Sequence, residues 1–243
     1  MTRHALLNNQ QHQHLRVRTE RSAALGDNHM FVPTFVAELR SVQAHYPVFF
    51  QKHPQTGDFQ PVALFGFQSG ENLFLTESGW DADYLPMLIE RQPFLIGYQA
   101  NPEVPGGQDR VIHIDLDSPR VNEQEGQALF LEFGGTTEYL QRIGAMLEAI
   151  HHGMQDNQAF VQSLLTLGLL ETFSLDIQLD NGARNQMLGF YTINEDKLAT
   201  LDGNALTALH EKGFLMAIYM ILASHSKLRD LIHRKNLQLE GDK

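Results

Sequence analysis

The chain has 243 residues, of which 42% are hydrophobic and 19% are charged, a composition typical of a globular protein rather than a disordered one. Its formal net charge of -11 argues against a nucleic-acid-binding surface and against adhesion to an anionic membrane, because both need an excess of basic residues. The sequence contains no cysteine, which excludes disulfides, zinc–thiolate sites and cysteine nucleophiles.

The start of the chain is polar and locally basic, and it is poor in large apolar side chains. We predict a mobile polar N-terminal arm over residues 1–28, followed by a single domain over residues 29–235. The first residues lack the apolar run of a secretory signal, and the longest apolar run, residues 214–223, is too short to span a bilayer. We therefore expect a cytoplasmic protein.

The first half of the predicted domain is rich in strands. A helix is expected over residues 33–44, because Pro33 suits a first turn and apolar residues follow at helical spacing. Apolar runs at 48–50 and 62–65 flank a Pro-Gln-Thr-Gly-Asp turn, which predicts a β-hairpin. Alternating residues over 111–117 predict another strand. We expect these three strands to share one antiparallel sheet.

The second half is richer in helices. An apolar stripe predicts a helix that begins at Thr136 or Thr137 and ends at Gly153, with a second helix over 158–167. Alternation over 173–179 and 188–193 then predicts a hairpin, which either extends the first sheet or forms a small second one.

Helices also dominate the end of the chain. A short helix capped by Asn194 and another near Leu206 precede a long final helix over residues 215–232. Because strands gather early and helices late, we predict an α+β fold. In that fold an antiparallel sheet, formed mainly by the N-terminal half, packs against helices of the C-terminal half, with an additional C-terminal hairpin.

Three polar residues alternate along the predicted strand over residues 111–117. His113, Asp115 and Asp117 would share one face, and one imidazole with two carboxylates can hold a divalent ion. The same pattern is also that of the solvated face of an amphipathic strand. The sequence lacks the common signatures of nucleotide-binding proteins, hydrolases and metalloproteases, so we predict no catalytic residue and no cofactor.

The segment from residue 45 to 97 is the most distinctive part of the sequence, and it contains the only tryptophan among prolines and a dense aromatic run. Its side chains combine flat apolar surface with a hydroxyl and a planar cation, which suits a carbohydrate, an aromatic ligand or a peptide partner. The alternative is that the same side chains only lock the fold. The binding residues predicted here are Asn72, Trp80, Tyr84, Arg91 and Phe94.

The order of elements in this segment resembles the SapC family of bacterial proteins. The family reads approximately HYP-V-F, then a hairpin, then E-N-L-F, G-W, Y-x-P and R-x-P-F, and this chain carries the same order from His45 to Phe94. The likeness covers about residues 30–232. It departs around Arg91, where the family commonly reads Arg-Arg-Tyr-Pro-Phe and this chain reads Glu-Arg-Gln-Pro-Phe.

The resemblance implies a setting beside TonB-dependent receptors, cupin-like proteins and flavin halogenases. We therefore expect a non-catalytic accessory or adaptor protein that binds a small ligand or a partner protein, the partner being a TonB-dependent receptor system or a halogenase-like flavoprotein. One alternative is an enzyme with an unrecognised, metal-assisted site. Another, suggested by the surface-layer locus from which the family takes its name, is a surface-layer-associated structural protein.

Overall fold

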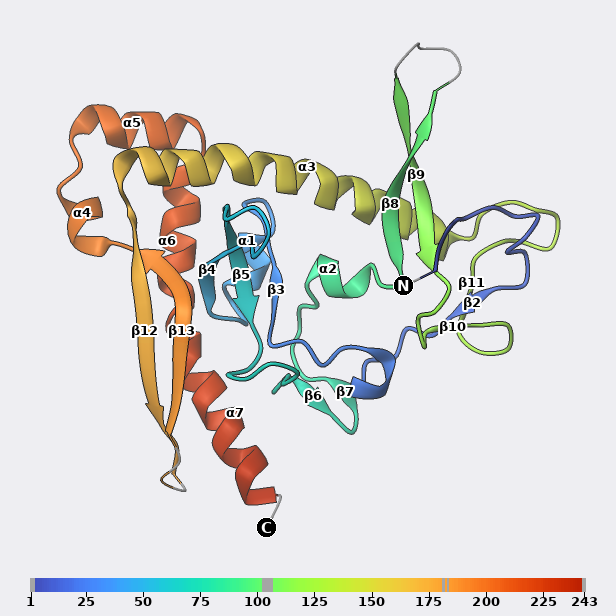
Figure 1. The fold of residues 1–243 in the computed structure, drawn as a ribbon, viewed down its shortest axis with the longest axis horizontal. Coiled ribbons are helices and arrows are strands. Elements are labelled where there is room, and N and C mark those ends of the chain that lie inside the picture. Colours follow the sequence, from blue (N-terminus) through green and yellow to red (C-terminus); the bar gives the residue numbers. More distant parts are fainter. Residues whose placement is uncertain (1–2, 102–106, 181, 183, 242–243) are drawn as a thin grey trace. The chain divides into compact units, whose positions relative to one another are not determined.

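The structure is a computed structural model that describes residues 3–101, 107–180, 182 and 184–241 (Figure 1). The chain divides into two compact units, each built from two separate stretches. Unit 1 consists of Met1–Asp27 and Met87–His151, and unit 2 of Asn28–Pro86 and His152–Lys243. The single domain expected over residues 29–235 is thus shared between two units.

Unit 1 contains two three-stranded antiparallel sheets. The first has the order β1 (His4–Leu6), β9 (Gln108–Asp115) and β8 (Phe94–Ala100), and the second β10 (Val121–Asn122), β2 (Arg16–Val17) and β11 (Gln127–Ala128). The short helices are η1 (Ala23–Leu25) and α2 (Met87–Glu90). The long helix α3 (Glu138–Leu167) begins in this unit, where Leu140, Ile143 and Leu147 join its hydrophobic core.

The predicted mobile arm is instead part of unit 1. Strand β1 pairs with β9, and β2 lies between β10 and β11. Val17 is fully buried, and Leu7 and Leu15 pack against the same core. Several of the few apolar side chains of this stretch therefore contribute to the core of unit 1, although the average hydrophobicity of the stretch is low.

Unit 2 is built on a five-stranded antiparallel sheet. Its strands are, in spatial order, β12 (Leu170–Gln178), β13 (Arg184–Ile193), β4 (Val48–Lys52), β5 (Phe59–Leu64) and β3 (Phe31–Pro33). The predicted hairpin of β12 and β13 is confirmed, and β13 joins it to β4. The prediction that the strand around Ile112 shares this sheet is wrong, because that strand, β9, pairs with β8 and β1 in unit 1.

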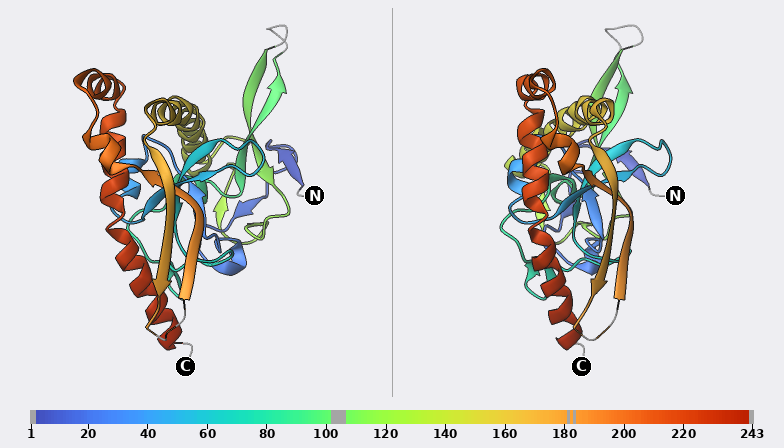
Figure 2. Two further views of the ribbon diagram at one scale, coloured as in Figure 1. Left: turned by 60° about the vertical axis from the view of Figure 1, so that its left-hand side comes forward. Right: turned by 90° about the vertical axis from the view of Figure 1, so that its left-hand side faces the viewer.

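Helices of the C-terminal half complete unit 2. They are α4 (Glu195–Ala199), α5 (Gly203–Glu211), α6 (Phe214–Ser224) and α7 (Lys227–Gly241). Asn194 caps α4 as predicted, since its side chain accepts a hydrogen bond from the Lys197 N–H at 2.7 Å. Helix α6 packs on β4 and β13, so the predicted α+β class is confirmed. The predicted final helix is divided near His225, although α6 and α7 run in line (Figure 2).

The helix predicted over residues 33–44 is reduced to α1 (Leu39–Val42). Asn157 explains why the preceding residues stay outside a helix. Its side-chain oxygen accepts a hydrogen bond from the Val36 N–H at 3.1 Å, and its amide nitrogen donates to the Thr34 carbonyl at 2.8 Å. Backbone groups that a helix would pair internally are therefore held by a side chain of α3.

The prediction that a helix ends at Gly153 is wrong, because the 30-residue helix α3 passes through Gly153 and ends at Leu167. Gly153 instead makes room for an aromatic ring. A Cβ atom at this position would lie 2.2 Å from Cδ2 of Phe35, which is 2% exposed. The glycine thus serves packing in unit 2 rather than helix termination.

No single helix of the described ranges is both long enough and apolar enough to cross a membrane. The helices Gly203–Glu211 and Phe214–Glu240, bent by 92° between them, satisfy the length and composition criteria only when they are taken as a pair.

Candidate functional site

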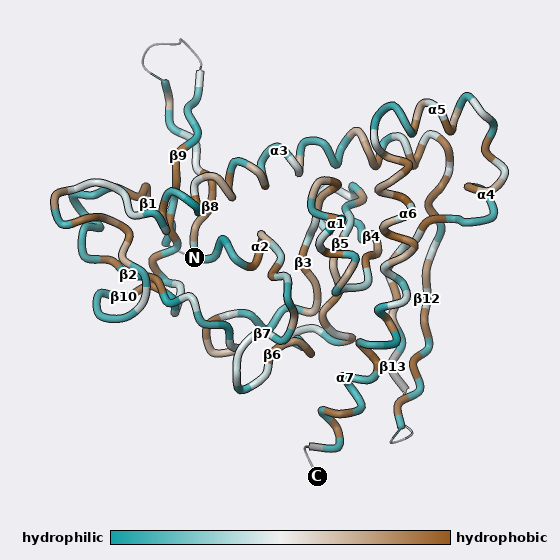
Figure 3. Tube along the Cα trace, turned by 180° about the vertical axis from the view of Figure 1, so that it is seen from behind, coloured by the Kyte–Doolittle hydropathy of each residue, from teal (hydrophilic) through white to brown (hydrophobic). Residues whose placement is uncertain are grey.

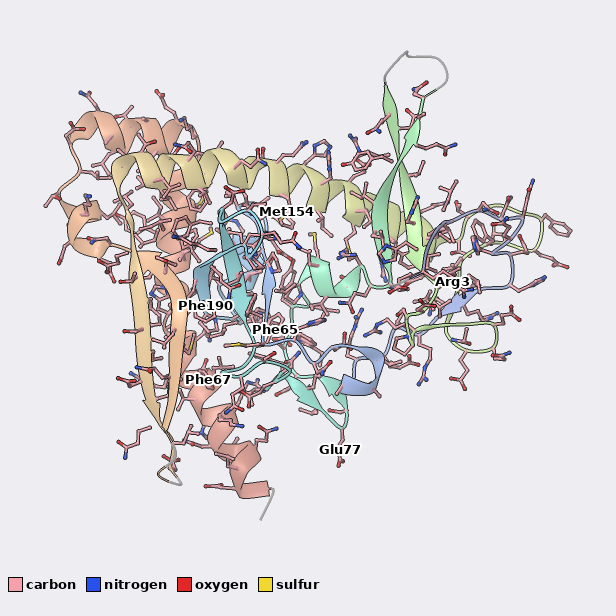
Figure 4. The ribbon with its side chains drawn as sticks, viewed as in Figure 1. Arg3, Phe65, Phe67, Glu77, Met154 and Phe190 are labelled. Atoms are coloured by element: carbon pink, nitrogen blue, oxygen red, sulfur yellow. The ribbon has the colours of Figure 1, made fainter. Side chains whose placement is uncertain are left out.

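Trp80 lies in an aromatic cluster of unit 2. The strands β6 (Leu75–Thr76) and β7 (Gly79–Trp80) form a small hairpin that carries it. The indole ring stacks on Phe74, with centroids 6.3 Å apart, and meets Phe65 edge-on at 5.1 Å. Phe65 is fully buried in this cluster, whereas the exposed Glu77 points outward from the turn of the hairpin (Figure 4).

A chain of hydrogen bonds supports Trp80 from the interior. Its Nε1 donates to the hydroxyl of Tyr46 at 2.8 Å, and that hydroxyl donates to the backbone carbonyl of Tyr84. The Tyr84 hydroxyl donates to the buried Glu38 carboxylate at 3.0 Å, which also accepts from Thr34 at 2.7 Å. Burial raises the pKa of the Tyr46 hydroxyl, so this group remains a protonated donor. The chain therefore fixes the position of the indole.

A polar pocket of about 380 Å³ opens beside Trp80. It is lined by residues of the β6–β7 region, by His45 after α1, and by side chains of α7. Its charged lining residues are Asp81, Asp83, Asp230, Lys227 and Arg234. We call this the Trp80 pocket. With His45 neutral, its three carboxylates and two cations leave an excess of one negative charge.

Most of the charges in the Trp80 pocket neutralise one another. Arg234 forms an ion pair with the Asp81 carboxylate, donates to the Asp81 carbonyl at 3.0 Å, and lies 4.5 Å from the centre of the Phe74 ring. Lys227 pairs with Asp230 at 3.1 Å. Asp83 has no ion-pair partner within the described residues. The pocket therefore offers one uncompensated carboxylate near an indole, an arrangement that favours an ammonium or guanidinium group.

The five predicted binding residues are divided between the units. Trp80 lines the pocket, and Tyr84 supports it through the hydrogen-bond chain. Asn72 is 9% exposed, and its side-chain oxygen accepts the Phe74 N–H at 3.0 Å.

Arg91 and Phe94 belong to unit 1. Phe94 is fully buried in the core of that unit, and its carbonyl accepts a hydrogen bond from Arg91. Burial lowers the pKa of the Arg91 guanidinium. Both residues thus have a structural role within unit 1.

The carboxylates near Trp80 were missed by the sequence reasoning, although the run Gly-Trp-Asp-Ala-Asp places two of them directly after the tryptophan. The α7 side chains carried no such signal, because Arg234 lies far from Trp80 along the chain.

The three metal-ligand candidates do not come together. Strand β9 ends at Asp115, whose side chain accepts the Asp117 N–H at 3.1 Å, so the chain turns before Asp117. The Asp117 carboxylate accepts the Arg3 N–H at 2.9 Å instead. The His113 ring packs over Gly97, where a Cβ atom would lie 2.2 Å from it. No group of three or more acidic or histidine side chains in the described part of the chain is arranged to hold a metal ion.

A buried ionic cluster was also missed, and it stabilises unit 1. Arg120 is 1% exposed and pairs with the fully buried Asp27. It also donates to the backbone carbonyls of Arg18 at 3.1 Å and Glu20 at 2.8 Å. Arg21 approaches the other Asp27 oxygen at 3.4 Å, and burial together with the Arg120 charge lowers the Arg21 pKa. These contacts bind the segment from Arg18 to Asp27, which was predicted to be part of a mobile arm, to Arg120 in the same unit.

Comparison with protein families gives a match to the SapC model over residues 7–231. The match includes Trp80, Asp83 and Asp230, whereas Arg234 lies just beyond it. Neither the search of curated proteins nor the search of solved structures found a match.

Proposed function

The chain belongs to the SapC family, and from this premise we propose that it is a non-catalytic accessory protein that binds a partner protein or a small ligand at the Trp80 pocket. The observation that carries the proposal is the uncompensated Asp83 carboxylate beside an indole in a pocket of about 380 Å³. Tryptophan is among the residues enriched at binding hot spots.

Two features of the pocket support binding. The hydrogen-bond chain from Trp80 through Tyr46 holds the indole before any ligand arrives, so little conformational entropy is lost on binding. The paired cations Arg234 and Lys227 keep Asp81 and Asp230 neutralised and leave Asp83 available. The group that fits best is therefore a primary ammonium or a guanidinium, either on a small molecule or on a partner's lysine or arginine.

The family resemblance suggests the class of partner. We propose a TonB-dependent receptor system or a halogenase-like flavoprotein, with the accessory protein acting in the cytoplasm. Cell fractionation tests the location, and recovery in the surface layer would favour the structural alternative.

The test is co-purification with the products of neighbouring genes, followed by titration calorimetry of any complex. We expect Asp83→Asn to weaken binding by roughly tenfold or more, because the only unpaired carboxylate of the pocket is lost. Trp80→Phe should weaken binding as well, because it removes the indole face.

Asp176→Asn, an equally conservative change of an exposed aspartate on β12, is the control and should bind normally. The proposal fails if no neighbouring product binds, or if both pocket variants bind as the wild type does while circular dichroism shows that they are folded.

A further inference from the structure

Helix α6 leaves an apolar face exposed in unit 2. Its buried side, which includes Ala217, Ile218 and Ile221, packs within the unit. On the opposite side Met216 is 52% exposed and Tyr219 is 55% exposed. Figure 3 shows that α6 is coloured mainly toward the hydrophobic end of the scale. Large apolar side chains gathered in this way on a surface are typical of an interaction site.

This face continues into the Trp80 pocket. The exposed Ala223 follows Tyr219 at helical spacing, and the pocket residues Lys227, Asp230 and Arg234 continue the same spacing of three or four residues. Helices α6 and α7 run in line, as Figure 2 shows, so these positions lie along one side. We call this surface, made of Met216, Tyr219, Ala223, Lys227, Asp230 and Arg234, the α6–α7 face. It is apolar at one end, and at the other it borders the Trp80 pocket, where Lys227 and Arg234 are paired with Asp230 and Asp81 and the Asp83 carboxylate is uncompensated.

We propose that the α6–α7 face binds an amphipathic helix of a partner protein. Apolar side chains of the partner, spaced three to four residues apart, would cover Met216 and Tyr219, and a lysine or arginine would enter the Trp80 pocket toward Asp83. The inference rests on the proposed function, because it uses the same pocket and specifies the kind of partner.

The distance between the apolar end of the face and the Trp80 pocket determines where the partner helix must carry its basic residue. Asp230 lies eleven positions after Tyr219, which corresponds to about 16 Å along a helix at 1.5 Å per residue. A partner helix lying along the face therefore needs its basic residue roughly three turns from the centre of its apolar stripe.

Charge favours this partner over two other occupants of the face. An anionic lipid headgroup at the pocket would meet the uncompensated Asp83 carboxylate, because Lys227 and Arg234 are already paired, and two copies of a chain with a net charge of -11 would repel each other. A basic amphipathic helix instead meets a pocket with one excess negative charge. One ligand then covers the apolar end of the face and reaches the Asp83 carboxylate of the Trp80 pocket.

The experiment selects helical 18-residue peptides without tryptophan from a display library, using the full chain as bait. Affinity is measured by the fluorescence of Trp80, the only tryptophan of the complex. We expect the selected peptides to share the apolar stripe and a basic residue about three turns away. Binding should weaken at least tenfold in Met216→Ser and in Tyr219→Ser, and Asp83→Asn should weaken it and reduce its salt dependence.

Leu188→Ser is the matched control, since Leu188 is a 63% exposed apolar residue on β13. It should bind the peptides as the wild type does. The inference is overturned if no sequence is enriched, if the enriched sequences lack the basic residue, or if Met216→Ser and Tyr219→Ser bind them normally.

Two further measurements test the other two occupants of the face, which are an anionic bilayer and a second copy of the chain. Membrane binding is measured by sedimentation with phosphatidylcholine–phosphatidylglycerol vesicles, and dimerisation by analytical ultracentrifugation. Both measurements compare the wild type with Tyr219→Ser. Vesicle binding or dimerisation that Tyr219→Ser abolishes would overturn the proposal.

The two proposals can also fail separately. If a neighbouring gene product binds and is lost with Asp83→Asn but not with Met216→Ser or Tyr219→Ser, the helix-docking inference fails and the proposed function stands. If no neighbouring product binds while the selected peptides behave as expected, the proposed function fails instead.

Discussion

The carboxylate of Asp27 pairs with the guanidinium groups of both Arg21 and Arg120, and it is fully buried. We expect Asp27→Asn to lower the free energy of unfolding by about 3–5 kcal/mol, because it removes the buried carboxylate that pairs with both Arg21 and Arg120. Chemical denaturation followed by circular dichroism measures the change.

Asp117→Asn is the control for this substitution, because it breaks a solvent-exposed pair with Arg3. The expected cost there is below about 1 kcal/mol. Equal costs at the two positions would show that burial of the Asp27 cluster contributes no stability.

His225 makes the stability of unit 2 depend on pH. Its Nε2 lies 3.2 Å from the Val48 carbonyl, its ring stacks on Phe49 with centroids 4.8 Å apart, and burial lowers its pKa below the ordinary 6.5. The unfolded chain therefore binds a proton at this residue before the folded chain does. The stability it contributes is present above pH 6.5 and is lost as the pH falls through the lower folded pKa.

Thermal melting between pH 8 and pH 5 measures this effect. We expect the melting temperature of the wild type to fall more steeply on acidification than that of His225→Gln, which keeps a donor for the Val48 carbonyl but does not titrate. Parallel curves would mean that other groups cause the dependence.

At the scale of elements, the continuity of α3 depends on a glycine that packing requires. Gly153→Ala should improve helix propensity by about 1 kcal/mol. The new Cβ would lie 2.2 Å from the Phe35 ring, and overpacking of this kind costs about 1–3 kcal/mol. We expect a net loss of stability in denaturant unfolding, and recovery when Phe35→Leu is added.

Gly203→Ala is the matched control, because a Cβ atom there would meet nothing within 4 Å at the start of α5. It should leave stability unchanged or raise it. If Gly153→Ala behaves in the same way, the close approach of Phe35 has no energetic consequence.

The elements that the sequence predicted correctly are those defined by neighbours along the chain. Alternation predicted the β12–β13 hairpin, and Asn194 predicted the start of α4. The elements it missed depend on distant contacts. Asn157 prevents the helix expected after Pro33, because its side chain binds backbone groups of that segment. Strand β9 pairs with β1 through backbone hydrogen bonds, and the alternation of side chains along β9 does not indicate which strand will be its partner.

The same distinction applies to the candidate site. Trp80 is conspicuous because it is the only tryptophan, and the two aspartates that follow it are adjacent in sequence. The cations of α7 that complete the Trp80 pocket could not be predicted, because no local pattern connects Arg234 with Asp81. Arg91 and Phe94 were grouped with Trp80 by sequence order, and the division of the chain places them in unit 1.

At the scale of the whole molecule, the α+β class was predictable and the division into units was not. Composition and hydrophobic periodicity indicate which side of each helix or strand is buried. They do not indicate which segments, distant along the chain, pack together to form each unit. The polar first residues show the difference, because Val17 is completely buried in a stretch that otherwise reads as solvated.

The chain crosses between its two units three times, after Asp27, Pro86 and His151, and the last crossing lies inside α3. Neither unit therefore corresponds to an uninterrupted stretch of the gene. Recombination at any single point would divide at least one unit, so the two cannot be exchanged among genes as separate cassettes. Transfer of unit 1 of this SapC chain to another gene would accordingly require two separate insertions, one for each of its stretches.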